Sequence, residues 1–162
     1  MTSALPRYQM YIGGRWVDSA SGEWLETDNP FLGQPWALIP RGSAADVDAA
    51  VTAARTALTS GDWPRLTPTR RGALLRRLGD LITERAAALA EIEVRDNGKL
   101  LAEMGAQVAY TAQWYHYYGG LAHYRANRPD RMAIHFEQFL KAAPEAPERA
   151  EVTEIMRTVR GR

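Results

Sequence analysis

The feature that most constrains this chain is a change in its hydrophobic period at Ser43. Before it, residues 8–39 form short apolar and β-branched runs separated by Gly, Pro, Asn and Asp, a pattern that predicts short strands. After it, apolar residues recur every three or four positions, which is the spacing of amphipathic helices. The order predicts an α+β fold, with short antiparallel strands followed by amphipathic antiparallel helices.

The strand region contains one clear hairpin signal. The stretch YQMYIGGRWV, residues 8–17, places Gly13-Gly14 between two arms of strand-forming residues, as in a two-residue hairpin turn. Further short strands are predicted at EWLET, residues 23–27, and WALIP, residues 36–40. Prolines lack an N–H for a strand ladder and so keep these strands short or at an edge. They are Pro30, Pro35 and Pro40.

Capping residues mark the first two helices. Ser43 is a predicted N-cap with Asp46 three residues on, and Thr67 is a predicted N-cap with Pro68 at the first helical position. The second helix carries a long apolar stripe and is predicted to run on to Gly98, which can adopt the positive φ that ends a helix. The stripe consists of Leu74, Leu75, Leu78, Leu81, Ile82, Leu89 and Ile92.

Helical spacing continues after Gly98. A third helix is predicted from Leu101 and is expected to weaken at Gly119-Gly120. The polar stretch YRANRPDR predicts a linker, MAIHFEQFLKAA a short helix, and residues 152–159 a last amphipathic helix. Each helix is apolar on one side, and the few short strands are too small to cover all these sides.

The composition excludes several classes of function. The formal net charge of the 162-residue chain is +1, whereas non-specific nucleic-acid binding needs a concentrated positive field. The chain has no cysteine, which excludes disulfides, thiolate zinc sites and cysteine nucleophiles. No apolar run approaches the roughly 20 residues that span a bilayer, and the first residues have no secretory pattern. A cytoplasmic protein without nucleic-acid or membrane partners is therefore expected.

The histidines, arginines and aromatic residues are interpreted structurally. His116 and His123 are seven residues apart and share a helix face, but metal sites favour other spacings, so these two and His135 are interpreted as surface or helix-end residues. The basic run is interpreted as a solvated helix face. It consists of Arg65, Arg70, Arg71, Arg76 and Arg77. Helix packing is favoured over a pocket for the aromatic cluster. It consists of Trp114, Tyr115, Tyr117 and Tyr118.

No catalytic or cofactor-binding residue is predicted from spacing. The chain has no G-x-G-x-x-G loop and no G-x-x-x-x-G-K-[ST] loop, so no phosphate cradle is predicted around Lys99. No Ser-His-Asp arrangement and no carboxylate pair can be derived from the order of residues.

Three stretches resemble a known family in their order and spacing. They are YIGGRWVDSASGEWLETDNPFLGQPWALIPRGSAADVDAAVTAARTAL, LTPTRRGALLRRLGDLITERAAALAEIEVRDNGKLLAE and YYGGLA. Together they resemble the opening of the NAD(P)-dependent aldehyde dehydrogenases over residues 8–123. The resemblance implies that the chain is an incomplete piece of the aldehyde dehydrogenase α/β fold.

The resemblance implies three segments. Residues 1–42 would form the N-terminal strand layer, and residues 43–123 would be the helical part of the nucleotide-binding domain, whose parallel sheet is built by later sequence in the family. Residues 124–162 do not resemble the family and are interpreted as an unrelated tail, with a linker and possible helices.

The resemblance also implies two sites. In many members an aspartate at the turn after the second long helix helps bind a monovalent cation, K+ or Na+, with backbone oxygens of a preceding strand; the matching positions here are Thr27, Asp28 and Asp96. The alternative is that Asp96 hydrogen-bonds the turn backbone. The helix that ends in YYGGLA borders the substrate entrance in the family, which places Gln107, Tyr110 and Trp114 near it.

Three hypotheses for function remain. The family oxidises aldehydes to carboxylic acids with NAD or NADP, but its nucleophilic Cys, general-base Glu and nucleotide-binding loop have no counterpart here. The chain is therefore predicted to be a truncated relative that is inactive alone. The alternatives are one subunit of a split aldehyde dehydrogenase, partnered by itself or by a complementary chain, and a helical protein-binding module.

Overall fold

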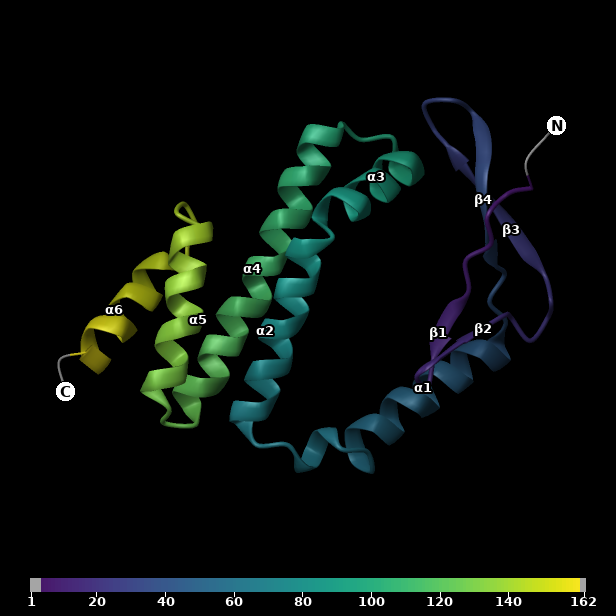
Figure 1. Cartoon of the computed structure of the whole chain (residues 1–162). Helices are drawn as coiled ribbons and strands as arrows, with labels where there is room; N and C mark the ends of the chain where they lie inside the picture. Colours follow the sequence, from purple (N-terminus) through teal and green to yellow (C-terminus); the bar gives the residue numbers. More distant parts are fainter. Residues whose placement is uncertain (1–3, 161–162) are drawn as a thin grey trace. The chain divides into compact units, whose positions relative to one another are not determined.

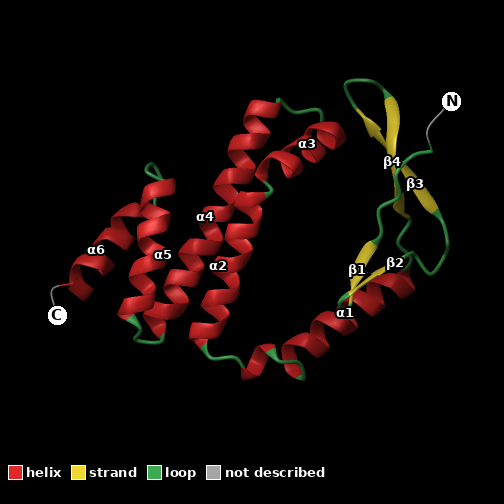
Figure 2. Cartoon of the chain, in the orientation of Figure 1, coloured by secondary structure: helices red, strands yellow, loops and turns green. Residues whose placement is uncertain are grey.

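The computed structural model describes residues 4–160, which divide into two compact units. One unit comprises the residues up to Arg65 together with Ile92–Leu100, and the other comprises Leu66–Glu91 together with the residues from Leu101 onward. These units are defined by tertiary contacts. The predicted segments 1–42, 43–123 and 124–162 are defined by the family resemblance, and the division into these segments stays a prediction. The mixed architecture of short antiparallel strands and helices confirms the predicted fold class (Figure 2).

The first hairpin lies where the glycine pair predicts it. Strands β1 (Met10–Ile12) and β2 (Arg15–Val17) pair antiparallel, with Ile12 opposite Arg15. The two turn residues, Gly13 and Gly14, have φ angles of 60° and 80°, a conformation that disfavours any residue with a side chain.

The second hairpin consists of β3 (Trp24–Asn29) and β4 (Gln34–Pro40). Its register shifts between Thr27 and Asp28, where a bulge interrupts the ladder. The extended chain before β1 also pairs with β4, because the Leu38 N–H donates to Pro6 O and the Tyr8 N–H donates to Leu38 O, both at 2.9 Å.

Helix α1 (Ala44–Thr59) begins with the predicted cap. Ser43 and Asp46 form a reciprocal capping box, in which the Ser43 N–H donates to Asp46 Oδ2 at 2.7 Å. The same carboxylate accepts from Ser19 Oγ at 2.6 Å and from the Ala20 N–H at 2.9 Å. With the Ser43 hydroxyl, which donates to Asp46 Oδ2 at 2.7 Å, these contacts hold the pKa of Asp46 well below its usual range and tie the turn after β2 to the start of α1. A short 3-10 helix, η1 (Trp63–Arg65), follows.

The second unit is helical. Helices α2 (Pro68–Glu84) and α4 (Leu101–Arg125) lie side by side, α5 (Pro129–Ala142) packs on α4, and α6 (Arg149–Arg160) packs on α5 (Figure 1). The predicted cap of α2 is present, since Thr67 Oγ1 accepts from the Arg70 N–H at 3.3 Å and Pro68 is the first helical residue. Within residues 4–160, no helix combines the length and the apolarity that crossing a bilayer requires.

The largest buried side chains belong to the region after residue 123. Phe136, Phe139, Met132 and Val152 are at most 1% exposed and form one core with Tyr117 of α4. Helices α5 and α6 therefore build a core against α4, and the prediction that Tyr117 serves packing agrees with its burial. Val152 and Met156, from the last predicted helix, are both buried in this core.

The prediction of one helix from Thr67 to Gly98 is wrong at Arg85. There the chain turns, with φ −110° and ψ 11°, and a separate helix α3 (Ala86–Asn97) begins. The Arg85 N–H is satisfied by the carbonyls of Leu81 and Ile82, so the break needs neither glycine nor proline. Helix α3 ends as predicted, at Gly98 with φ 73°, whose N–H donates to Val94 O at 3.0 Å.

The predicted weak point at Gly119-Gly120 and the linker after it are also wrong. Helix α4 continues to Arg125, and only residues 126–128 separate it from α5. Both glycines are buried, and a Cβ at Gly120 would overlap the Phe136 ring. Their role is close packing against α5, and that packing stabilises the helix they would otherwise weaken.

We predict that Gly120→Ala lowers the free energy of unfolding by about 1–3 kcal/mol, because the added methyl group must displace the buried ring of Phe136. Gly105→Ala is the matched control on the same helix: its Cβ would meet nothing within 4 Å, so alanine should stabilise the helix by roughly 0.5–1 kcal/mol. Urea unfolding measures both. Equal effects of the two substitutions would contradict this packing.

Candidate functional site

The first candidate site joins strand β3 to the end of helix α3. Thr27 Oγ1 donates to Asp96 Oδ1 at 2.6 Å, across 69 residues of sequence. Pro30, directly after β3, lies against Gly98, where a Cβ would come within 3.2 Å of the proline ring. The two segments that the resemblance assigns to a cation site are thus in contact.

The backbone at this junction leaves oxygen atoms available. Asp28 lies opposite Pro35 in the register, and a proline has no N–H to donate to β3. Together with the bulge between Thr27 and Asp28, this interrupts the ladder next to the Asp96 carboxylate. The donor set would be one carboxylate and backbone carbonyls, which suits a hard monovalent ion. Among the described residues no group of three or more His, Cys, Asp or Glu side chains could hold a metal ion, so a cation at Asp96 would need backbone carbonyls as ligands.

The turn itself provides the alternative to a cation. Asn97 Nδ2 donates to Glu93 Oε2 at 2.9 Å, and Asn97 Oδ1 accepts from the Lys99 N–H at 2.9 Å. The turn backbone is therefore held by Asn97, while the Asp96 side chain faces Thr27. A cation at Asp96 and the alternative that Asp96 bonds the turn backbone both stay predictions.

The predicted substrate-entrance residues share one face of α4. Gln107, Tyr110 and Trp114 are three and four residues apart, and the rings of Tyr110 and Trp114 meet edge to face at 5.9 Å. Gln107 and Tyr110 are exposed and Trp114 is half-buried. Their role at an entrance stays a prediction, because the remaining walls of such an entrance would come from sequence outside this chain.

The second candidate site is a cluster of three histidines that the sequence interpretation missed. His116, His123 and His135 are 5%, 2% and 3% exposed, so the interpretation as surface residues is wrong, although His123 does lie in the last turn of α4. They lie between α2, α4 and α5, and the rings of His123 and His135 are 4.8 Å apart. The Nδ1 atom of each is buried without a hydrogen-bond partner. The seven-residue spacing of His116 and His123 correctly indicated one face, but the small residues on α2 that face them were not recognised as the reason for their burial.

Glycines make room for the imidazoles. A Cβ at Gly72 would come within 2.9 Å of His123 Nε2, and one at Gly79 within 3.1 Å of His116 Nε2. A Cβ at Gly119 would come within 2.8 Å of His135 Nδ1. Each imidazole therefore occupies the space that the side chain of a larger residue would fill at the facing glycine of the neighbouring helix.

Burial holds all three histidines toward the neutral form. It lowers the pKa of His116 and His123, and it lowers the pKa of His135 to about 4, with His123 and Arg76 adding repulsion of the charged form. Asp80, whose Oδ1 lies 3.7 Å from His116 Nε2, opposes this shift but is too distant for a hydrogen bond.

The comparisons with known proteins point to one family. The model of the aldehyde dehydrogenase family matches residues 16–142. The chain belongs to the aldehyde dehydrogenase family. The match extends past residue 123 through helix α5, so the interpretation of residues 124–142 as part of an unrelated tail is wrong.

Individual relatives agree. The (Z)-2-((N-methylformamido)methylene)-5-hydroxybutyrolactone dehydrogenase of Acinetobacter baylyi is 39% identical over 118 residues, which are 73% of this chain and 24% of that protein. The NAD-dependent aldehyde dehydrogenase of Sinorhizobium meliloti superposes with a TM-score of 0.67 at 36% identity, over 72% of this chain and 24% of that one. The aldehyde dehydrogenase of Bacillus cereus, solved with NAD+, gives a TM-score of 0.68 at 36% identity, over 70% and 23%.

The chain spans about a quarter of the length of these relatives. This confirms the predicted family and the prediction that the chain corresponds to a piece of its fold. The activity, substrate and cofactor of the whole proteins come from the remaining three quarters as well, and so they are not assigned to this chain by similarity.

We predict that Asp96→Ala removes any stabilisation of the chain by potassium. The variant also loses the hydrogen bond from Thr27, which costs about 0.5–1.5 kcal/mol in any salt. Thr27→Val is the matched control, because it removes the hydrogen bond but keeps the carboxylate and the carbonyls. Melting temperatures are compared in potassium and tetramethylammonium chloride of equal ionic strength. A cation site requires that Thr27→Val keep the increase in melting temperature with potassium. If Asp96→Ala also keeps that increase, the site is rejected.

We predict that the chain loses stability as the pH falls below about 6.5. A buried histidine with a lowered pKa takes up its proton more readily in the unfolded chain, so stability is lost from the unfolded pKa near 6.5 down toward the folded value, about 4 for His135. The loss from His135 alone is on the order of 2 kcal/mol at pH 5. His135→Asn, which cannot titrate, should unfold with a flatter pH dependence in this range. An unchanged pH slope would show that His135 already charges in the folded chain.

Proposed function

We propose that this chain supplies the amino-terminal strands and helices of an aldehyde-oxidising enzyme that uses NAD or NADP, and that the chain alone does not oxidise aldehydes to carboxylic acids. The observation that carries the proposal is the family match over residues 16–142, on a chain a quarter as long as its relatives. A cytoplasmic location, without nucleic-acid or membrane partners, belongs to this proposal.

The chemistry of the family supports the proposal that the chain alone does not oxidise aldehydes. Aldehyde oxidation in the family begins with a thiolate that attacks the carbonyl carbon, and the resulting adduct then donates hydride to the nicotinamide. The chain contains no cysteine, so it has no side chain for this attack. A catalytic centre would require groups supplied by other sequence.

The exposed face of helix α2 supports the proposal that this chain is part of a larger enzyme. Leu74 and Leu78 of the predicted stripe are 52% and 42% exposed, and Leu89 and Ile92 of α3 are also exposed. Burial of a large aliphatic side chain contributes roughly 1.5–3 kcal/mol, so this face is a substantial unused source of stability. Helices α5 and α6 lie against α4 and leave the α2 leucines exposed. A complementary dehydrogenase segment, or a second copy of this chain, is the partner we propose for them.

The test is an activity assay with and without the missing part. The purified chain is given a panel of aldehydes with NAD+ and with NADP+, and reduction of the cofactor is followed by absorbance. We expect no rate above the blank. Mixing with the remaining three quarters of a relative should restore aldehyde oxidation if this chain completes an enzyme. Turnover by the chain alone, which survives repurification and is lost in the Gly120→Ala variant, would overturn the proposal.

A helical protein-binding module is the second candidate, and one observation favours it. The region after residue 123 is not a loose tail: α5 and α6 bury Phe136, Phe139 and Val152 in a core of their own with α4. A unit with such a core can be stable without the rest of a dehydrogenase. Stable folding of the chain together with failure to complement any dehydrogenase, and capture of one defined unrelated partner, would support this candidate over the first.

We predict that the chain binds a hydrophobic dye or self-associates through the α2 leucines, because exposed contiguous apolar patches drive association. The double substitution Leu74→Gln and Leu78→Gln should reduce dye fluorescence and shift sedimentation toward the monomer. Ala87→Gln, at an exposed position on α3, is the control and should change neither. A monomeric parent chain without dye binding would contradict the prediction.

A further inference from the structure

A cavity of about 240 Å³ lies between α2, α4 and α5, beside the histidine cluster. It is far larger than the space of one water molecule, which needs roughly 10–15 Å³. Its polar lining comes from three helices. Its ionisable side chains are Arg76, Arg77, Asp80, His123, Arg131 and His135.

The lining carries an excess of positive charge. It contains three guanidinium groups and one carboxylate, while Glu84 and Asp130 outside the lining pair with Arg77 and Arg131. The charges of Arg131 and Arg76 act on the histidines directly, since Arg131 lowers the pKa of His123 and Arg76 lowers the pKa of His135. Positive groups that repel one another across a concave surface favour an anion between them.

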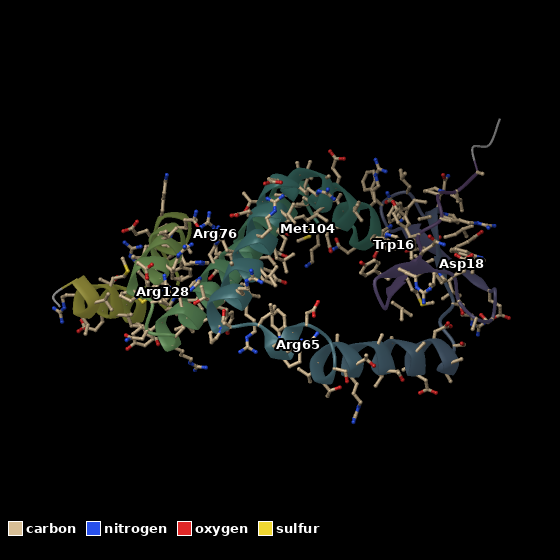
Figure 3. The ribbon with its side chains drawn as sticks, turned by 60° about the horizontal axis from the view of Figure 1, so that its bottom comes forward. Trp16, Asp18, Arg65, Arg76, Met104 and Arg128 are labelled. Atoms are coloured by element: carbon tan, nitrogen blue, oxygen red, sulfur yellow. The ribbon has the colours of Figure 1, made fainter. Side chains whose placement is uncertain are left out.

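Two arginines of the lining, Arg76 of α2 and Arg131 of α5, form long ion pairs with nearby carboxylates. Arg76 Nε lies 3.7 Å from Asp80, and Arg131 Nε lies 3.8 Å from Asp130, both longer than a hydrogen bond. Arg77 differs, because its Nη1 reaches Glu84 Oε1 at 3.1 Å. Arg76 of α2, labelled in Figure 3, and Arg131 of α5 line the same cavity. Guanidinium groups bind oxyanions through two parallel hydrogen bonds, which suits this pair.

We propose that this cavity binds a small oxyanion of the phosphate or sulfate class between Arg76 and Arg131, and that protonation of His123 and His135 tightens the binding. A neutral imidazole has one donor, whereas the charged form has two and adds a positive charge. The anion stabilises the charged imidazoles, and by reciprocity the charged imidazoles increase affinity for the anion. The other titratable groups around them are Asp80 of α2, His116 of α4, and Arg128 and Asp130 at the start of α5.

Titration of the full chain with sulfate, observed through its histidines, tests this proposal. Sulfate keeps one charge state between pH 5.5 and pH 8, so a change in affinity reports protein groups rather than the ligand. The chain has three histidines in all, so its imidazole NMR signals are few enough to assign. Ionic strength is held constant with chloride, and signals are preferred to melting temperature because sulfate stabilises folded proteins non-specifically.

We expect the His123 and His135 signals to saturate with sulfate, with binding at least about fivefold tighter at pH 5.5 than at pH 8. The double variant Arg76→Gln and Arg131→Gln should lose saturation, whereas Arg125→Gln, exposed on α4 and outside the cavity, should retain it. Circular dichroism checks that the double variant is folded; if it is not, the single Arg131→Gln variant, at a 61% exposed side chain, decides.

Two results would overturn the proposal. Equal sulfate responses in the parent and in the folded cavity variant would show binding elsewhere, and equal affinity at both pH values would show that the imidazoles take no part. Inorganic phosphate and glycerol phosphate are then compared at one pH. Tighter binding of inorganic phosphate would identify a free oxyanion as the ligand, and tighter binding of glycerol phosphate would identify a phosphate ester.

Discussion

The close approach of helices α2 and α4 is the constraint on which the helical unit depends. A Cβ at Gly72 would come within 3.0 Å of Gly119 O, and one at Gly79 within 3.0 Å of Ala112 O. The contacts run in opposite directions along the two helices, so the pair is antiparallel, and each repeats after seven residues, two helical turns. Any larger residue at these points would separate the backbones, because the atom in the way is a main-chain oxygen that cannot rotate aside.

This close contact decides where the polar groups lie. With no side chains on α2 at Gly72 and Gly79, the imidazoles of His123 and His116 enter the interface and become buried. Gly119 does the same for His135 of α5, and its neighbour Gly120 admits Phe136. One glycine-lined interface thus brings together an apolar core on one side of α4 and a cluster of titratable groups on another. The loss of hydrogen bonds at three Nδ1 atoms is a cost that the packing around them must offset.

The local elements of this structure follow from the sequence where a single residue decides the conformation. Ser43 with Asp46, Thr67 with Pro68, Gly13-Gly14 and Gly98 each impose a cap or a turn by their own chemistry, and each appears at its predicted place. The family resemblance correctly indicated the contact between Thr27 and Asp96, which are far apart in sequence and which spacing alone could not bring together.

Features that depend on tertiary packing could not be predicted in this way. The turn at Arg85 occurs within a run of good helix formers, and nothing local marks it. The low helix propensity of Gly119-Gly120 predicts a weak helix. Packing of Phe136 and His135 from α5 against these glycines stabilises the helix instead. The burial of His116 and His123 depends on Gly79 and Gly72, more than thirty residues earlier in the chain, so the sequence around the histidines does not reveal it. Each glycine and histidine contact depends on two residues that are distant in the sequence, so neither residue alone predicts it.

The same reasoning connects the family-like part of the chain with the region after it. Gly119 and Gly120 belong to the stretch YYGGLA, which resembles the family, while His135, Phe136 and Arg131 belong to α5, beyond the quoted motifs. The glycines determine how closely α5 can pack, and α5 supplies Arg131 and His135 to the cavity whose other wall is Arg76 of α2. The cavity therefore requires both parts at once. A chain that lacked α5 would keep the α2 and α4 contact but would leave Gly120 without the ring that packs on it, and the cavity without Arg131 and His135.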